Sequence, residues 1–220
     1  MHVFLAGASR GVGREIAKQL VIAKYQVTAL LRSPKCADDL AAMGITVVQG
    51  DALEAELMVQ LIGQNPPDAV VSTIGSLPSD SGTRVDFFGN KNLIDAAAKA
   101  KVNSFILISS IGSGSSAPAL PPNVMETLGP VLIEKAKAED HLAASGMNYT
   151  VIRPGGLVSE PATGQAVLTE DPMIAGSIPR AGVAQLAVRC VESDRAKNKI
   201  FSAIDLSMQR SAKEFEVVEL

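Results

Sequence analysis

Aromatic residues and cysteine are scarce in this sequence. Its 220 residues contain no tryptophan, two tyrosines and two cysteines, and the aromatic fraction is 4%. So few aromatic rings argue against a surface that stacks nucleic-acid bases. Cys36 and Cys190 have no spacing typical of a zinc site or a disulfide framework, so we expect free thiols, a reducing compartment and no bound metal.

Long apolar runs and a strong net charge are also missing. No apolar stretch approaches the roughly 18 residues that a membrane-spanning helix requires. The net charge of −3 gives no general attraction for nucleic acid or anionic membranes. A strand is predicted from residue 2, which leaves no room for a signal peptide, so we expect a cytoplasmic protein. The apolar content of 47% indicates a folded chain, and its length suits a single α/β domain.

The first turn of the chain carries the strongest motif. His2–Ala6 is a short apolar run typical of a buried parallel strand. Val12, Ile16 and Leu20 then recur with helical spacing. Glycines between a strand and a helix let the backbone approach a pyrophosphate, although a plain tight turn is the alternative. The spacing is Gly-x-x-x-Gly-x-Gly, and the predicted cofactor contacts are Gly7, Ser9, Arg10, Gly11, Val12 and Gly13.

The second predicted strand, 26–31, ends at a cation. A carboxylate at this place would hold the ribose 2′-hydroxyl of NAD, whereas a cation suits the 2′-phosphate of NADP. Arg32 stands there, Ser33 adds a hydroxyl, and Arg10 in the glycine loop is a second cation. Because the planar guanidinium matches phosphate geometry, we predict NADPH as the cofactor. The alternative is that both arginines are solvated loop residues.

Predicted strands alternate with helices along the rest of the chain. This order implies right-handed crossovers and a doubly wound parallel sheet of the Rossmann type. The further strands are predicted at 45–48, 68–73, 104–109, 149–153 and 200–204. A ligand of such a sheet lies outside the carboxyl ends of the strands. The loops there supply the remaining predicted cofactor contacts, which are Asp51, Ala52, Thr73, Ile74, Gly75, Ser109, Pro154, Gly155, Gly156 and Leu157.

The predicted domain covers residues 1–205, and a C-terminal tail follows over 206–220. The Gly-, Ser-, Ala- and Pro-rich stretch 112–122 is predicted as a mobile loop over the site, and 130–144 as a helix. A polar loop is predicted over 76–83. For Asp51, a role in capping the next helix is an equal alternative to cofactor binding.

These motifs resemble those of an atypical, NmrA-like short-chain dehydrogenase/reductase. The residues that carry the likeness are Gly7–Gly13, Leu31-Arg32, Gly50–Ala52, Ser109–Gly112, Lys135 and Arg153–Gly156. The small size is similar to the NAD(P)H-binding group of biliverdin IXβ reductase/flavin reductase. The resemblance implies catalytic roles for Ser110 and Lys135. The alternatives are that Ser110 caps its own loop and that Lys135 pairs on the surface with Glu139, four residues further on.

One position departs from the superfamily. Its Tyr-x-x-x-Lys motif would place a phenol acid where this chain has Val131. Interconversion of alcohols and ketones uses that acid, whereas a conjugated acceptor can take its proton from solvent. The resemblance therefore implies an NADPH-dependent oxidoreductase that passes hydride to a planar acceptor such as a flavin, a bilin or a quinone. Loops 112–122 and 161–171, the latter with a short strand at 165–168, would flank the acceptor.

The alternative, implied by NmrA-like proteins, is an NAD(P)H-binding redox sensor or assembly factor without turnover. A nucleotide-sugar epimerase is disfavoured because the chain has little length for a sugar-binding lobe. A monomer is compatible with the sequence.

Overall fold

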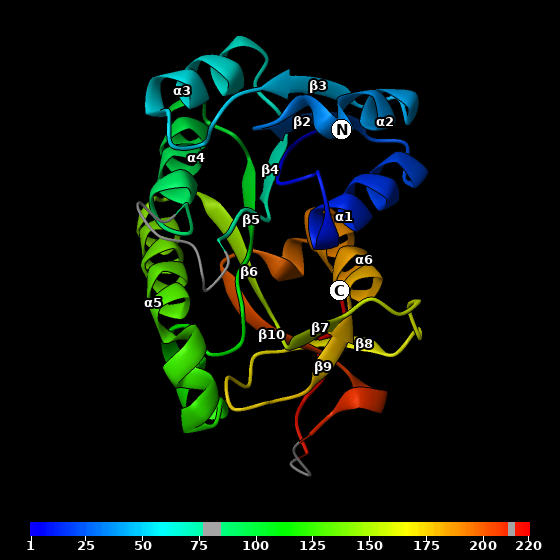
Figure 1. The fold of residues 1–220 in the computed structure, drawn as a ribbon, viewed down its shortest axis with the longest axis vertical. Helices are drawn as coiled ribbons and strands as arrows, with labels where there is room; N and C mark the ends of the chain where they lie inside the picture. The colour runs from blue at the N-terminus through cyan, green and yellow to red at the C-terminus, as the bar shows by residue number, and fades with distance from the viewer. Residues whose placement is uncertain (77–84, 211–213) are drawn as a thin grey trace.

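The computed structural model describes residues 1–76, 85–210 and 214–220, and an eight-stranded sheet runs through it (Figure 1). The strand order is β3-β2-β1-β4-β5-β6-β10-β8. Paired strands are parallel, except that β8 runs antiparallel to β10. This sheet confirms the predicted fold class. The strands are β1 (His2–Ala6), β2 (Gln26–Leu31), β3 (Thr46–Gln49), β4 (Ala69–Ser72), β5 (Ser104–Ile108), β6 (Asn148–Pro154), β8 (Ala166–Thr169) and β10 (Lys199–Asp205).

Helices cover both faces of the sheet. Alternate residues of β1 show the division: Val3 and Leu5 belong to the core under α1 and α6, whereas Phe4 belongs to the core under α3, α4 and α5. Figure 1 shows helices α3, α4 and α5 along one side of the sheet. The helices are α1 (Gly11–Ile22), α2 (Ala37–Ala42), α3 (Ala55–Gln64), α4 (Phe88–Lys99), α5 (Pro122–Ala144) and α6 (Arg180–Glu192).

The topology fixes where a ligand can lie. Strand β1 sits between β2 and β4, so the chain extends the sheet first to one side of β1 and then to the other. A crevice forms at such a switch point, outside the carboxyl ends of the two diverging strands. The loops that follow β1, β4 and β5 therefore meet at one edge.

The structure differs from the sequence-based expectation in the middle of the chain. Helix α5 begins at Pro122, so Pro130 lies inside it rather than at its start. The stretch predicted as a mobile loop contains a 3₁₀ helix, Gly114–Ala119, whose Ser116 is fully buried. Except for Ser76, the polar loop predicted over 76–83 lies outside the described residues. The short helix α2 and the two-stranded pair β7 (Gly156–Val158) and β9 (Ser177–Pro179) were not predicted, because they are too short to show a period.

The segment 206–220, predicted as a C-terminal tail, contacts the domain in its described parts. Gln209 pairs with Gly176 in an antiparallel bridge, and Val218 pairs with Leu168 of β8. The Arg189 guanidinium also donates to the carbonyl oxygen of Leu220 at 3.3 Å. Single bridges of this kind leave no pattern in the sequence.

Candidate functional site

The glycine loop packs against the end of β4. Gly7 has a φ of +95° and Gly11 a φ of +58°, the left-handed region that favours glycine. A Cβ on Gly13 would overlap the carbonyl oxygen of Gly7 and come within 2.5 Å of Thr73 Oγ1. Thr73 Oγ1 lies 3.2 Å from the carbonyl oxygen of Ala6 and 3.3 Å from that of Gly7. Gly13 thus permits the close approach of α1, and Thr73 ties the loop to β4.

The N-terminus of α1 is open to an anion. Its N-cap residue, Arg10, has an extended backbone and makes no side-chain cap, and the first turn contains no acidic residue. The first N–H groups of the helix, which form the positive end of its dipole, are therefore available to a ligand. Val12 is buried in the core, so only its backbone is placed to contact a cofactor. The carbonyl oxygen of Ser9 lies 3.7 Å from Cys36 Sγ.

A cleft of about 800 Å³ adjoins this helix terminus. Arg180 Nη1 donates to Ser159 Oγ at 2.8 Å, and its Nε is 3.9 Å from where a Cβ of Gly11 would lie. Arg14 Nη1 is buried with no hydrogen-bond partner among the described residues. An orphaned buried donor beside two further arginines fits a phosphate-bearing ligand. The cleft is lined by Arg10, Gly11, Arg14, Glu15, Ser159, Glu160, Pro161, Arg180 and Ala181.

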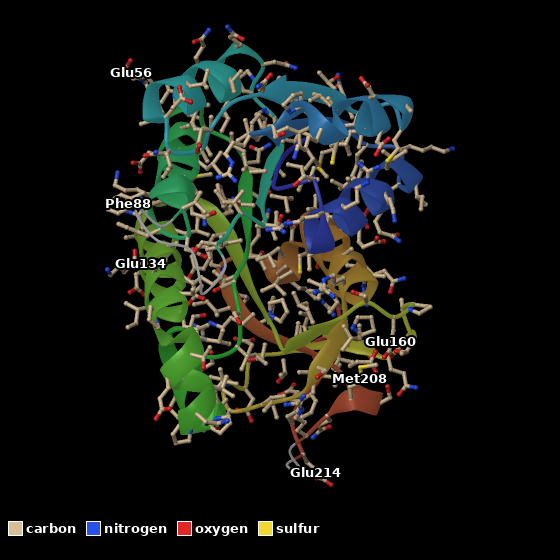
Figure 2. The ribbon with its side chains drawn as sticks, viewed as in Figure 1. Glu56, Phe88, Glu134, Glu160, Met208 and Glu214 are labelled. Atoms are coloured by element: carbon tan, nitrogen blue, oxygen red, sulfur yellow. The ribbon has the colours of Figure 1, made fainter. Side chains whose placement is uncertain are left out.

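Arg180, the first residue of α6, was missed as a site residue, because no recognisable motif surrounds it. Figure 2 shows Glu160, at the rim of the same cleft, on the side of the molecule away from α5. The loop after β7 and the start of α6 therefore form a wall opposite α1.

Four of the predicted cofactor contacts lie in the loops after β2 and β3. Arg32 is exposed at the end of β2, and Ser33 Oγ accepts the backbone N–H of Lys35. Asp51 Oδ1 accepts the backbone N–H of Leu53 at 3.0 Å, in a turn before α3 rather than at its N-cap. Ala52 is buried among the core residues under α3 and α4. None of these contacts involves the Arg32 guanidinium.

Lys135 reaches the end of β4. Its Nζ lies 3.3 Å from Oδ1 of Asp86, which has no exposed surface. A Cβ on Gly75 would come within 3.0 Å of both atoms, so the chain leaving β4 through Ile74 passes against this pair. Asp86 was missed in the sequence, because it precedes α4 without any recognisable motif. Ser110 Oγ lies 2.9 Å from the carbonyl oxygen of Ile111, a local contact at the end of β5.

A second buried ion pair, between Arg153 and Glu139, contacts the serines on either side of Ser110. Arg153 Nη2 is 2.5 Å from Glu139 Oε2, and Arg153 Nη1 donates to Ser115 Oγ at 2.9 Å. Glu139 Oε1 also accepts from Ser109 Oγ and lies 2.7 Å from Ser113 Oγ. This network holds the 109–115 segment on the sheet, so Ser109 is a structural anchor. Because Glu139 pairs with Arg153, the proposed surface pair with Lys135 is wrong.

Neither tyrosine lies at this edge. Tyr149 is the second residue of β6, at the amino end of that strand. Tyr25 precedes β2 and donates to Glu192 Oε1 at 2.5 Å. Burial, and then that carboxylate, raise the pKa of Tyr25 to about 12. Val131, at the position of the superfamily tyrosine, is buried in α5. The described part of the site therefore contains no phenol acid.

The residues after β6 pack against the segment before β9. A Cβ on Gly155 would overlap the carbonyl oxygen of Gly176, and the Gly156 N–H donates to that oxygen at 2.9 Å. The carbonyl oxygen of Pro154 accepts the N–H of Ile111, while Leu157 is 40% exposed. The two glycines thus serve backbone packing at the edge of the site.

The described residues contain neither a candidate metal cluster nor a membrane-spanning helix. No group of three or more His, Cys, Asp or Glu side chains there is suited to a metal ion. Over the same residues, no helix has the length and apolar character needed to cross a membrane.

Comparison with known proteins agrees with this geometry. The model of a family described as NAD(P)H-binding matches residues 7–194. The chain belongs to this NAD(P)H-binding family. A chloroplastic protein of Arabidopsis thaliana, itself uncharacterised, is 34% identical over 216 residues, which cover 92% of this chain and 76% of that protein. The family match and the fold confirm the resemblance to atypical short-chain dehydrogenases/reductases.

Two similar proteins are reductases. The structure of ChuY, an anaerobilin reductase from Escherichia coli O157:H7, has a TM-score of 0.87 and 29% identity, covering 96% of this chain and 100% of that one. Sanguinarine reductase of Eschscholzia californica is 37% identical over 125 residues, which are 54% of this chain and 44% of that protein. The family match of this chain itself is to NAD(P)H-binding proteins, so its expected cofactor is a nicotinamide dinucleotide.

Proposed function

We propose that this protein is an NADPH-dependent reductase that passes hydride to a planar, conjugated acceptor such as a flavin or a bilin. The proposal depends on one observation: the site offers a paired lysine, Lys135, and a serine, Ser110, but Val131 replaces the phenol acid. Protonating an alkoxide needs a positioned acid. A conjugated ring system spreads the charge, so solvent can deliver the proton. Similarity to an anaerobilin reductase supports a bilin-type acceptor.

In this proposal the chain's own residues bind and orient the dinucleotide and the acceptor. The reduced nicotinamide supplies the hydride. The N-terminus of α1, with Arg10, Arg14 and Arg180, holds the phosphates. Lys135 donates to a ribose hydroxyl, and the Ser110 hydroxyl turns away from the Ile111 carbonyl to donate to the acceptor or to the nicotinamide amide. Both side chains therefore contribute mainly positioning.

The cofactor preference is tested at Arg32. We expect Arg32→Asp to remove the preference for NADPH over NADH, because a carboxylate repels the 2′-phosphate and accepts from a 2′-hydroxyl. A charge-assisted hydrogen bond is worth about 1.5–3 kcal/mol, so NADPH affinity should fall roughly 10- to 100-fold. Calorimetric titration with both dinucleotides measures the change. Lys99→Asp makes the same charge change at the far end of α4 and should leave both affinities unaltered. Equal affinities in the wild type would contradict the prediction.

Ser110→Ala tests whether the serine positions or protonates. We expect turnover to fall only about tenfold, or roughly 1.4 kcal/mol in the barrier, because positioning is lost but no acid is removed. A general acid would be worth about a hundredfold or more. Val131→Tyr should not raise the rate of flavin reduction. A large gain in that variant would show that the reaction needs a phenol proton.

The reaction itself is tested by following NADPH absorbance with flavins, bilins and quinones as acceptors. The proposal expects one of these classes to be reduced well above the uncatalysed rate. If NADPH binds but none is reduced, the protein is better explained as a redox sensor or an assembly factor.

A further inference from the structure

Asp86 is a buried carboxylate whose two oxygens have different surroundings. Its side chain has no exposed surface. Oδ2 accepts the backbone N–H of Ser76 at 3.0 Å and also contacts the Ser76 hydroxyl. Oδ1 accepts no hydrogen bond of good geometry from the described residues, yet Lys135 Nζ lies only 3.3 Å from it. The second oxygen is therefore directed at the ammonium group.

Asp86 is held firmly in this place. Asn90 Nδ2 donates to the carbonyl oxygen of Asp86 at 2.7 Å, and Asn90 Oδ1 accepts from Ser72 Oγ at 2.6 Å. Ser72 is the last residue of β4, so these bonds join the start of α4 to the end of that strand. The carboxylate is fixed relative to the carboxyl edge of the sheet.

Lys135 has more N–H donors than Asp86 Oδ1 can accept. An ammonium group carries three N–H donors, and only one can point at Asp86 Oδ1. The lysine side chain is 16% exposed, so it is not sealed in the core with its partner. Glu139, one turn further along α5, forms its ion pair with Arg153 and not with Lys135. Glu134, the residue before Lys135, lies on the outer side of α5 (Figure 2).

The geometry points to Asp86 as the positioning residue of Lys135: it holds the ammonium beside Gly75 so that its remaining donors meet a hydroxyl of the dinucleotide. A charge removed from water needs a close opposite charge, so the carboxylate selects one position for a long and flexible side chain. Asp86 touches neither cofactor nor acceptor and acts through Lys135. This inference rests on the proposed function in one respect, that a dinucleotide lies along this edge.

A double-mutant cycle on NADPH affinity tests the inference. The variants are Asp86→Asn, Lys135→Met and the combination, each titrated with NADPH by calorimetry. We expect each single change to weaken binding about tenfold, the size of one charge-assisted hydrogen bond. In the Lys135→Met background, Asp86→Asn should add less than about twofold. A role for Asp86 in folding alone would give the same loss in both backgrounds and would overturn the inference.

Gly75→Ala gives a second route that leaves Asp86 in place. Its φ is not in the left-handed region, and the added methyl would lie 3.0 Å from both Asp86 Oδ1 and Lys135 Nζ. We expect it to weaken binding clearly more in the wild type than with Lys135→Met, because only in the wild type does the methyl displace the ammonium group. A matched control is Asp95→Asn on α4, whose carboxylate pairs with Lys91 at the surface and should leave affinity unchanged. An equal loss of affinity in Gly75→Ala with and without Lys135 would also overturn the inference.

The titration needs no acceptor. A protein that reduces no flavin, bilin or quinone would contradict the proposed reaction, while the coupling between Asp86 and Lys135 would still be measured.

Discussion

Gly13→Ala is expected to weaken NADPH binding more than any other single-methyl change in the chain. The new Cβ would overlap the Gly7 carbonyl oxygen and come within 2.5 Å of Thr73 Oγ1. Overpacking of this kind costs about 1–3 kcal/mol, and moving the loop relieves it. In the proposed function the loop carries the N–H groups that bind phosphate, so its displacement should lower affinity by roughly 10- to 100-fold. Calorimetric titration measures the loss, and circular dichroism shows whether the helices remain.

Alanine variants of two other glycines distinguish the effect of steric crowding on binding from that of backbone strain. Gly63→Ala, in α3, places its methyl in open space and should leave binding unchanged. Gly11→Ala adds a methyl with room around it but at a φ of +58°, so it should strain the loop by about 1 kcal/mol without obstructing it. Wild-type affinity in Gly13→Ala would mean that the close approach of α1 is not needed for binding.

The strands of the large sheet could be predicted from the sequence, because buried runs such as Val3–Ala6 and Phe105–Ile108 are apolar throughout. Even β8 was predicted within one residue, although nothing in its four residues indicates the antiparallel direction. The short elements β7, β9 and α2 were missed. Their existence depends on partners distant in sequence rather than on a local period.

Side-chain pairing was less predictable than the backbone. Lys135 and Glu139 have the spacing of a helical ion pair, but in the fold each meets a different element. Asp86 precedes α4 and Arg153 lies in β6, and both partners are buried. The composition of 112–122 indicated a mobile loop, since glycine and serine are common there. No feature of the sequence indicated that Arg153 donates to Ser115, which lies 38 residues away.

Breaking the buried pair of Arg153 and Glu139 is expected to be the most destabilising change. Their side chains are only 4% and 2% exposed, so Arg153→Met leaves an uncompensated carboxylate inside the protein. Removing one partner of such a pair costs about 3–5 kcal/mol. At about 2–4 °C per kcal/mol for a chain of this size, the melting temperature should fall by roughly 6–20 °C.

A double variant and a surface control complete that experiment. Arg153→Met with Glu139→Met removes both charges and should recover part of the loss. Recovery should be incomplete, because Ser109 loses its acceptor carboxylate. Lys91→Met breaks the exposed pair with Asp95 and should cost no more than about 0.5 kcal/mol. Because the network anchors the 109–115 segment, Arg153→Met should also weaken NADPH binding at temperatures where the variant is folded. Equal melting temperatures for Arg153→Met and Lys91→Met would show that the buried pair does not stabilise this edge.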